Sequence, residues 1–214
     1  HFEAGTTTAV TGNFGAGKST FLRLITGKLA PQSGQVLIDG VEMQQILPDW
    51  WETHYGYLSE EPSFLEETLR AYLGQWGGDD DSISMALVES GLKSVVNQLP
   101  RGPNTSIRDH SLTSLKIRKR IGLAGIIAKQ PSLIVLDEPT AGLDPQTALI
   151  FYNFINRMMA DQRTLIIATS DPVIIKGAGH NIVIDDQGHL KPVLKNTPSQ
   201  LGKVSSKSLK QERP

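Results

Sequence analysis

Short apolar runs alternate with longer segments of helical periodicity along most of the chain. The apolar, β-branched runs predict strands at 6–11, 34–40, 55–58, 132–138 and 164–170. Apolar positions at helical spacing predict helices at 18–26 and 145–160, and residues 181–193 have the pattern of a closing hairpin. Strands that alternate with helices form a parallel sheet covered on both faces, so we predict an α/β fold with a mostly parallel sheet.

The segment from about residue 64 to residue 128 interrupts this alternation. Its apolar positions follow a helical period at 64–73, 82–90 and 114–129, and the polar stretch 74–81 predicts a solvated loop. We therefore predict a helical subdomain at about 64–128, inserted into a domain that covers residues 1–194.

Composition and charge exclude several classes of protein. The 214 residues carry a net charge of −1, which offers no field for nucleic acid, and we expect no nucleic-acid partner. The chain has no cysteine, which excludes disulfides and thiolate metal sites. Residues 195–214 hold five Lys or Arg against one Glu, a composition that predicts a disordered basic tail.

The stretch "GNFGAGKST", residues 12–20, matches the pattern G-x-x-x-x-G-K-[ST]. Glycines let successive backbone N–H groups point at phosphate oxygens, and the following helix adds the positive end of its dipole. In this pattern Lys18 reaches the outer phosphates and Ser19 binds Mg²⁺. We predict that ATP phosphates are held by Gly12, Asn13, Phe14, Gly15, Ala16, Gly17, Lys18, Ser19 and Thr20.

Two carboxylates follow a later apolar strand. In "LIVLDE" four apolar residues precede Asp137 and Glu138, so both lie at the carboxyl edge of the predicted sheet, where ligands collect. We predict that Asp137 holds Mg²⁺ and that Glu138 acts as the general base toward an attacking water.

With these motifs the chain resembles the ATP-binding domain of ABC transporters over nearly all of residues 1–194. The most family-specific stretch is "DEPTAGLD", residues 137–144, in which the resemblance implies that Asp144 faces a partner domain. The segments "YGYLSEEPSFLEETLRAYL" (55–73) and "NTSIRDHSLTS" (104–114) resemble exporters, whereas "DEPTAGLD" by itself also resembles importers.

The resemblance implies a fold, cofactors and partners. It implies a P-loop NTPase (RecA-like) core that binds ATP and Mg²⁺ and forms a homodimer or heterodimer with a second such domain, each ATP lying between the two. It also implies work at the cytoplasmic face of a membrane, such as a bacterial inner membrane, together with transmembrane domains. Because His1 is not a natural start, we expect those domains to be fused upstream of it.

The chain departs from the family in the signature segment. Where the family has LSGGQ, this chain has "TSLKI", residues 113–117, so Ser114 remains available to a phosphate while Leu115 and Lys116 replace glycines. A side chain in place of glycine crowds the approach of backbone N–H groups to a phosphate. The basic triplet that follows, residues 118–120, is interpreted as a solvated helix face.

Two further departures concern catalysis. Where the family has a glutamine that touches Mg²⁺ and water, this chain has Glu60, or Glu61 if the alignment shifts by one residue. Where the family has a histidine that contacts the terminal phosphate, it has Ser170, and spacing makes His180 and His189 surface residues rather than substitutes.

These departures leave two functions open. The first is an ATPase domain that powers transport, most simply export, with catalytic residues Glu138, Lys18, Ser170 and Glu60, cofactor contacts that include Ser114 and Asp144, and metal contacts from Ser19, Asp137 and Glu60. The second is a nucleotide-gated clamp that binds ATP, closes against an active partner and turns over little. A soluble repair or translation protein would need coiled-coil insertions or a second domain, and the chain has neither.

Overall fold

The computed structural model describes residues 1–65, 68–76, 79–193 and 201. The predicted tail at 195–214 therefore lies outside the described residues, apart from Leu201. Within the described ranges, none of the helices has the length and apolar character needed to cross a membrane.

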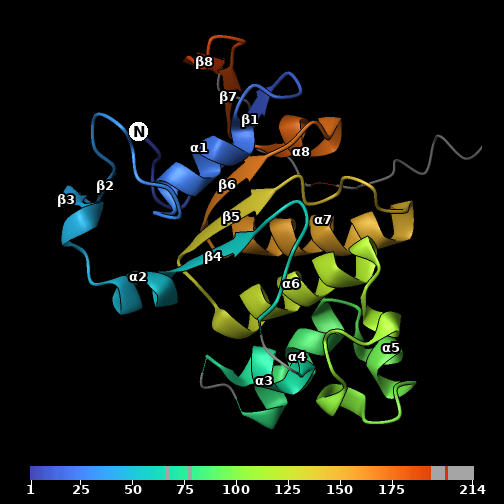
Figure 1. The fold of residues 1–214 in the computed structure, drawn as a ribbon. Helices are drawn as coiled ribbons and strands as arrows, with labels where there is room; N and C mark the ends of the chain where they lie inside the picture. The colour runs from blue at the N-terminus through green and yellow to red at the C-terminus, as the bar shows by residue number, and fades with distance from the viewer. Residues whose placement is uncertain (66–67, 77–78, 194–200, 202–214) are drawn as a thin grey trace, which may run out of the picture.

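A six-stranded sheet forms the centre of the structure (Figure 1). Its strand order is β4-β5-β6-β1-β7-β8, with parallel pairing throughout except for the antiparallel hairpin of β7 and β8. The predicted α/β fold with a mostly parallel sheet is confirmed. The strands are β1 (Thr7–Gly12), β4 (Tyr55–Leu58), β5 (Leu133–Asp137), β6 (Thr164–Ala168), β7 (His180–Ile184) and β8 (Leu190–Val193).

The strand predicted at 34–40 is wrong in length. Only β2 (Leu37–Ile38) forms there, and it pairs with β3 (Val41–Glu42) in a separate two-stranded sheet. The intervening Asp39 and Gly40 have φ values of 49° and 83°, the left-handed conformations of a tight hairpin turn. The Asp-Gly pair therefore ends the first strand early.

Eight α-helices cover the sheet or extend from it in the described chain. The sequence pattern missed α2, α5 and α8, which have only five to seven residues and so display little of an apolar period. It also placed the start of a helix at residue 64, whereas α3 begins at Leu69. The helices are α1 (Lys18–Ile25), α2 (Pro48–His54), α3 (Leu69–Gly74), α4 (Asp80–Glu89), α5 (Lys93–Asn97), α6 (Leu115–Lys129), α7 (Pro145–Ala160) and α8 (Pro172–Gly177).

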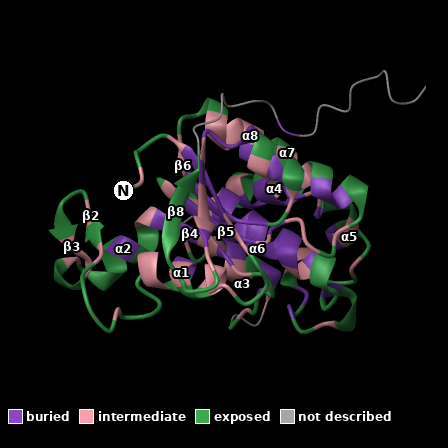
Figure 2. Cartoon of the chain, turned by 90° about the horizontal axis from the view of Figure 1, so that it is seen from above, coloured by how far each residue is buried: buried purple, intermediate pink, exposed green. Residues whose placement is uncertain are grey.

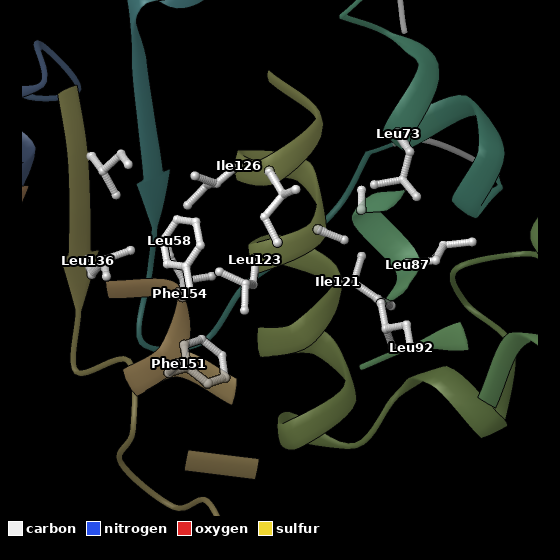
Figure 3. Close-up of a cluster of buried hydrophobic side chains, with 14 of the residues drawn as sticks. Leu58, Leu73, Leu87, Leu92, Ile121, Leu123, Ile126, Leu136, Phe151 and Phe154 are labelled. Atoms are coloured by element: carbon white, nitrogen blue, oxygen red, sulfur yellow. The ribbon is translucent and has the colours of Figure 1, made fainter. Parts of the chain in front are cut away.

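Side chains that alternate along the central strands build a separate core on each face of the sheet. On β5, Ile134 and Leu136 pack in the larger cluster with residues of α6, α7 and α8, whereas Val135 packs with Leu22 of α1 on the opposite face. Figure 2 shows the resulting band of buried residues through β5 and α6, and Figure 3 shows the larger cluster, with Phe151 of α7 beside the sheet.

The helices between residues 69 and 129 pack on one another, and α6 joins them to the sheet through contacts with α3, α4 and β4 (Figure 1). The loop predicted at 74–81 extends too far, because Asp79 caps α4 by accepting a hydrogen bond from the Ser82 amide, and Asp80 and Asp81 form its first turn. Carboxylates at a helix N-terminus are stabilised by the helix dipole, which explains why they start the helix.

Thr68 offers a test of helix capping in this block. Its hydroxyl oxygen accepts a hydrogen bond of 3.1 Å from the Ala71 amide at the start of α3. We expect Thr68→Ala to lower the free energy of unfolding by about 1 kcal/mol in urea titrations, since one N–H of the first turn loses its acceptor. Thr68→Ser keeps that acceptor and serves as the control, and equal losses in both variants would contradict the capping role.

Candidate functional site

The glycine-rich loop joins β1 to α1. Gly12 has a φ of 154°, and a Cβ there would lie 2.6 Å from the Ile184 carbonyl oxygen on the neighbouring strand. Gly17 occupies the N-cap of α1 with a φ of 95°, a left-handed conformation that favours glycine. Backbone constraint therefore accounts for the first and last glycines of the loop.

The loop leaves open space where phosphates are expected. A Cβ added to Gly15 or Gly17 would meet no described atom within 4 Å. Ala16, Lys18 and Ser19 are partly buried. Four other residues of the loop are exposed, and the Phe14 side chain is fully so: Asn13, Phe14, Gly15 and Thr20. The Asn13 side chain donates from its Nδ2 to the Asp186 carboxylate over 2.9 Å, which ties the loop to the β7–β8 turn.

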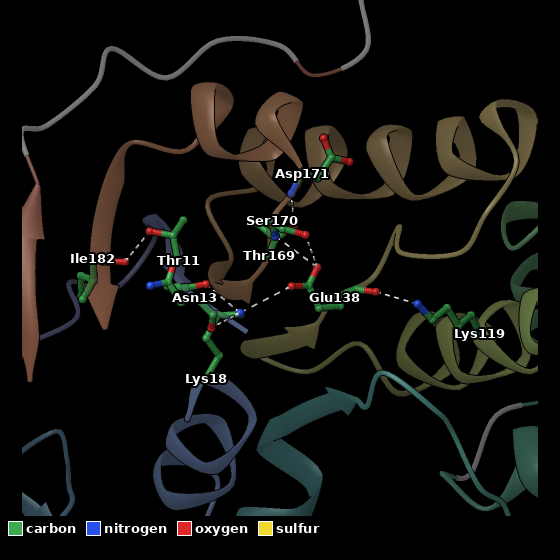
Figure 4. Close-up of polar contacts among 10 residues, drawn as sticks. Thr11, Asn13, Lys18, Lys119, Glu138, Thr169, Ser170, Asp171 and Ile182 are labelled. Atoms are coloured by element: carbon green, nitrogen blue, oxygen red, sulfur yellow. Dashed lines mark hydrogen bonds and ion pairs between the residues drawn. The ribbon is translucent and has the colours of Figure 1, made fainter. Parts of the chain in front are cut away.

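Lys18 and Glu138 come from different elements and meet at the carboxyl edge of the sheet (Figure 4). The Lys18 Nζ lies 3.9 Å from Glu138 Oε1, and it donates over 3.0 Å to the Gly12 carbonyl. The second Glu138 oxygen accepts hydrogen bonds from the Ser170 amide and hydroxyl, at 3.1 and 3.2 Å. Three of the predicted catalytic residues, Lys18, Glu138 and Ser170, are thus brought together.

Asp137 lies beside this group and is only 2% exposed. The Tyr57 hydroxyl donates to its Oδ2 over 3.4 Å, and burial, reinforced by the charge of Asp137, raises the pKa of Tyr57 to about 12. Within the described ranges the Oδ1 atom of Asp137 has no hydrogen-bond partner. A buried carboxylate oxygen left free for a ligand fits a Mg²⁺ site, in which one or two protein oxygens act with phosphates and waters.

No described cluster of three or more His, Asp or Glu side chains could hold a metal ion by itself. Magnesium that binds here would therefore depend on Ser19 and Asp137 together with nucleotide oxygens. Glu60, the remaining predicted metal contact, is exposed on the segment after β4. Its negative charge favours the protonated form of Lys119 and so opposes the lowering of the Lys119 pKa by burial.

The predicted contacts to a partner's nucleotide lie at the N-termini of two helices. Ser114 is the exposed N-cap residue of α6, and Asp144 caps α7 by accepting from the Thr147 amide. The pKa of Asp144 is lowered to about 2, and the largest cause is the pair of hydrogen bonds that it accepts from the amide and the hydroxyl of Thr147. Lys116 Nζ lies 3.4 Å from Asp144 Oδ2, so the signature segment 113–117 and the loop that ends at Asp144 meet within one chain.

The interpretation of residues 118–120 as a solvated helix face is wrong. Arg118 is half-buried, Arg120 is 8% exposed, and Lys119 is wholly buried. The Arg120 Nε donates to the Ser90 carbonyl over 2.9 Å, and Lys119 donates to carbonyls of the 138–141 segment. Burial lowers the pKa of both side chains. A run of basic residues does not by itself reveal which neighbouring carbonyls will receive them.

The sequence also gave no sign of a hydrogen-bonded centre at Asp171. One of its carboxylate oxygens accepts from the Thr140 hydroxyl at 2.7 Å and from the Tyr152 hydroxyl at 2.6 Å. The other oxygen caps α8 by accepting from the Val173 amide. Asp171 therefore fixes the loop that carries Ser170 against the loop after Glu138. Of the two histidines, His189 is exposed and His180 is half-buried in β7.

The sequence resembles those of ABC transporters. The sequence model of the family described as ABC transporter matches residues 1–141. The chain is 31% identical over 169 residues to ABC transporter B family member 21 of Arabidopsis thaliana, covering 77% of this chain and 13% of that protein. It is 28% identical over 188 residues to the ATP-dependent lipid A-core flippase of Bordetella avium, covering 83% of this chain and 32% of that one.

The fold also matches a solved structure. A bacterial Atm1-family ABC exporter with ATP bound superimposes with a TM-score of 0.77 at 24% identity, covering 86% of this chain and 33% of that chain. The chain spans 13% of the length of the Arabidopsis relative that it matches.

Proposed function

We propose that this chain, which belongs to the ABC transporter family, binds MgATP and hydrolyses it slowly to power transport, most simply export. The observation that carries the proposal is the ion pair of Lys18 with Glu138 beside the open phosphate loop, at the carboxyl edge of a parallel sheet where the buried Asp137 precedes Glu138. This juxtaposition unites the groups that phosphoryl transfer to water requires.

Each residue has a role that follows from its position. The loop amides and the Lys18 ammonium bind the phosphates and stabilise the negative charge that grows on them. Ser19 and Asp137, with Glu60 as a further predicted contact, would hold Mg²⁺, which when bound neutralises phosphate charge. Glu138 orients the attacking water and accepts its proton, while Ser170 holds the Glu138 carboxylate in place.

The departures from the family support slow turnover. The imidazole contact to the terminal phosphate is replaced by the short neutral Ser170, whose hydroxyl is engaged with Glu138. In the signature segment Leu115 is 38% exposed, and its side chain occupies a place where glycine lets a partner's phosphate approach. Loss of one such charge-stabilising donor typically lowers the rate by about 10²–10³-fold.

Ser170→His tests the origin of the slow rate. We expect phosphate release to rise by about tenfold or more, since an imidazole adds a donor for phosphate charge while the residue's backbone amide still binds Glu138. The measurement is steady-state phosphate release at saturating MgATP. Ser170→Ala, which removes the hydroxyl and adds no donor, is the control and should show no gain, and an unchanged rate in Ser170→His would place the limit elsewhere.

A nucleotide-gated clamp is the second candidate, and the exposed Glu60 together with the segment 113–117 favours it. A clamp binds MgATP and pairs with a second domain, yet adds little turnover of its own. Saturable nucleotide binding without phosphate release, combined with stimulation of an intact partner domain, would select the clamp over the ATPase.

The proposed partners are a second ATP-binding domain, in a homodimer or heterodimer, and transmembrane domains at the cytoplasmic face of a membrane. The flippase and exporter among the similar proteins support this proposal. Copurification with membrane domains, or a nucleotide-dependent shift in mass on size exclusion, would test it.

A further inference from the structure

Lys119 is a charged side chain that is fully buried, with an exposed fraction of 0%. It lies in α6, and its Nζ donates to the Glu138 carbonyl at 2.6 Å and to the Ala141 carbonyl at 2.8 Å (Figure 4 shows the first of these contacts). Taking a lysine wholly out of water is costly, and an apolar side chain would fill the same volume without that cost. The position of this lysine therefore needs a reason beyond packing.

Its two acceptors are the end residues of one turn. The Ala141 amide donates over 3.2 Å to the Glu138 carbonyl, so the turn runs from Glu138 to Ala141, and Lys119 binds the carbonyls of both. A second overlapping turn follows, in which the Leu143 amide donates to the Thr140 carbonyl. The ammonium thus joins the two ends of the turn through charge-assisted hydrogen bonds, which are about twice as strong as neutral ones.

The turn begins at a strained residue. Glu138 has a φ of 43°, a left-handed conformation that is unfavourable for a non-glycine residue and persists only where the surroundings enforce it. Its amide donates to the Ala168 carbonyl and its carbonyl is bound by Lys119, so the backbone is held on both sides. This conformation directs the carboxylate toward Lys18 and Ser170.

We propose that Lys119 is a positioning residue, which fixes the turn 138–141 and thereby holds the Glu138 carboxylate in its productive direction. The proposal rests on the proposed ATPase function and adds a residue to it. Asp171, which binds Thr140 within the same turn, constrains it through a separate hydrogen bond.

Lys119→Met removes both hydrogen bonds while keeping the length of the side chain. We expect kcat for MgATP hydrolysis to fall by about tenfold to a hundredfold, the size of loss that follows when a catalytic group is misplaced. The KM and the nucleotide dissociation constant should stay within about threefold of the parent, because a residue that acts only on the transition state leaves ground-state binding intact. Lys119→Gln keeps N–H donors and should recover part of the loss.

Arg118→Met is the matched control, since Arg118 precedes Lys119 on α6 and makes neither of these contacts. Three results would each overturn the positioning role of Lys119. They are a parent-like kcat in Lys119→Met, a loss of kcat in Arg118→Met equal to that in Lys119→Met, and a loss of nucleotide affinity in Lys119→Met as large as its loss of kcat. If Lys119→Met does not fold, Lys119→Gln carries the test alone. Its shorter arm should cost several-fold in kcat at constant KM, and an unchanged kcat would overturn the proposal.

A second measurement separates failure of the positioning role of Lys119 from failure of the proposed function. If the parent chain binds nucleotide without turnover, the ATPase proposal fails. The positioning role of Lys119 is then judged by amide hydrogen exchange in nucleotide-free protein. Exchange at Ala141 and Leu143 should then be at least about tenfold faster in Lys119→Gln than in the parent, while exchange in the middle of α7 stays unchanged. Unchanged amide exchange at Ala141 and Leu143 would overturn the positioning role of Lys119, whatever the rate of ATP hydrolysis.

Discussion

Glu138→Gln is expected to lower the rate of ATP hydrolysis by about 10²–10⁴-fold, the range that a positioned general base contributes. The amide occupies the same volume and can still accept a hydrogen bond from the Ser170 amide, so the fold of the site should persist. It cannot take a proton from water. Phosphate release under single-turnover and steady-state conditions measures the loss.

Nucleotide binding should survive this substitution, and that contrast makes the prediction specific. A carboxylate 3.9 Å from Lys18 competes with the phosphates for the ammonium, so its neutralisation should leave MgATP affinity equal to or above that of the parent. Glu42→Gln, on the separate β2–β3 sheet, is the control for a lost surface charge. Parent-like hydrolysis in Glu138→Gln would remove Glu138 from its role.

Lys18→Ala is expected to lower kcat/KM for MgATP by about 10³-fold or more, because it removes a charged phosphate contact both from the bound state and from the transition state. Titration calorimetry with MgATP should show the binding part of the loss, and phosphate release should show the remainder. The Lys18 ammonium also binds the Gly12 and Asn13 carbonyls, and the melting temperature reports how far the loop depends on it.

Two controls separate charge from geometry at this position. Lys18→Arg keeps the positive charge but presents a planar, longer group that does not fit the loop, so it should rescue little. Lys28→Ala removes a lysine that lies over the Tyr55 and Tyr57 rings and should bind MgATP like the parent. If Lys18→Ala gave a parent-like titration, the phosphate-binding role of residues 12–20 would be refuted.

Local signals carried much of the fold. The strands ending at Gly12 and Asp137 were predicted because apolar, β-branched runs next to helical periods specify buried parallel strands. The helix at 145–160 was predicted with its observed ends, since its apolar positions recur at helical spacing. Short elements such as α2 were missed, because seven residues of mixed polarity span only about two helical turns and display little of an apolar period.

The site divides in the same way. The loop 12–20 and the pair Asp137 and Glu138 were predictable, because their chemistry is written in consecutive residues. That Ser170 holds the Glu138 carboxylate was not predictable, since the contact joins residues 32 positions apart through the register of β5 and β6. The meeting of Asp171 with Thr140 and Tyr152 depends on the same register.

The sequence by itself determined the phosphate loop, the paired carboxylates and the alternation of strands and helices, because each depends on neighbours within a few residues. Only the tertiary structure decided that Lys119 is buried and bound to the turn at Glu138. Its burial follows from the packing of α6 against β4 and the helices around it, whereas the local pattern shows only a basic triplet. Long-range packing sets which polar groups leave water, and a buried charge takes its partners from segments distant along the chain.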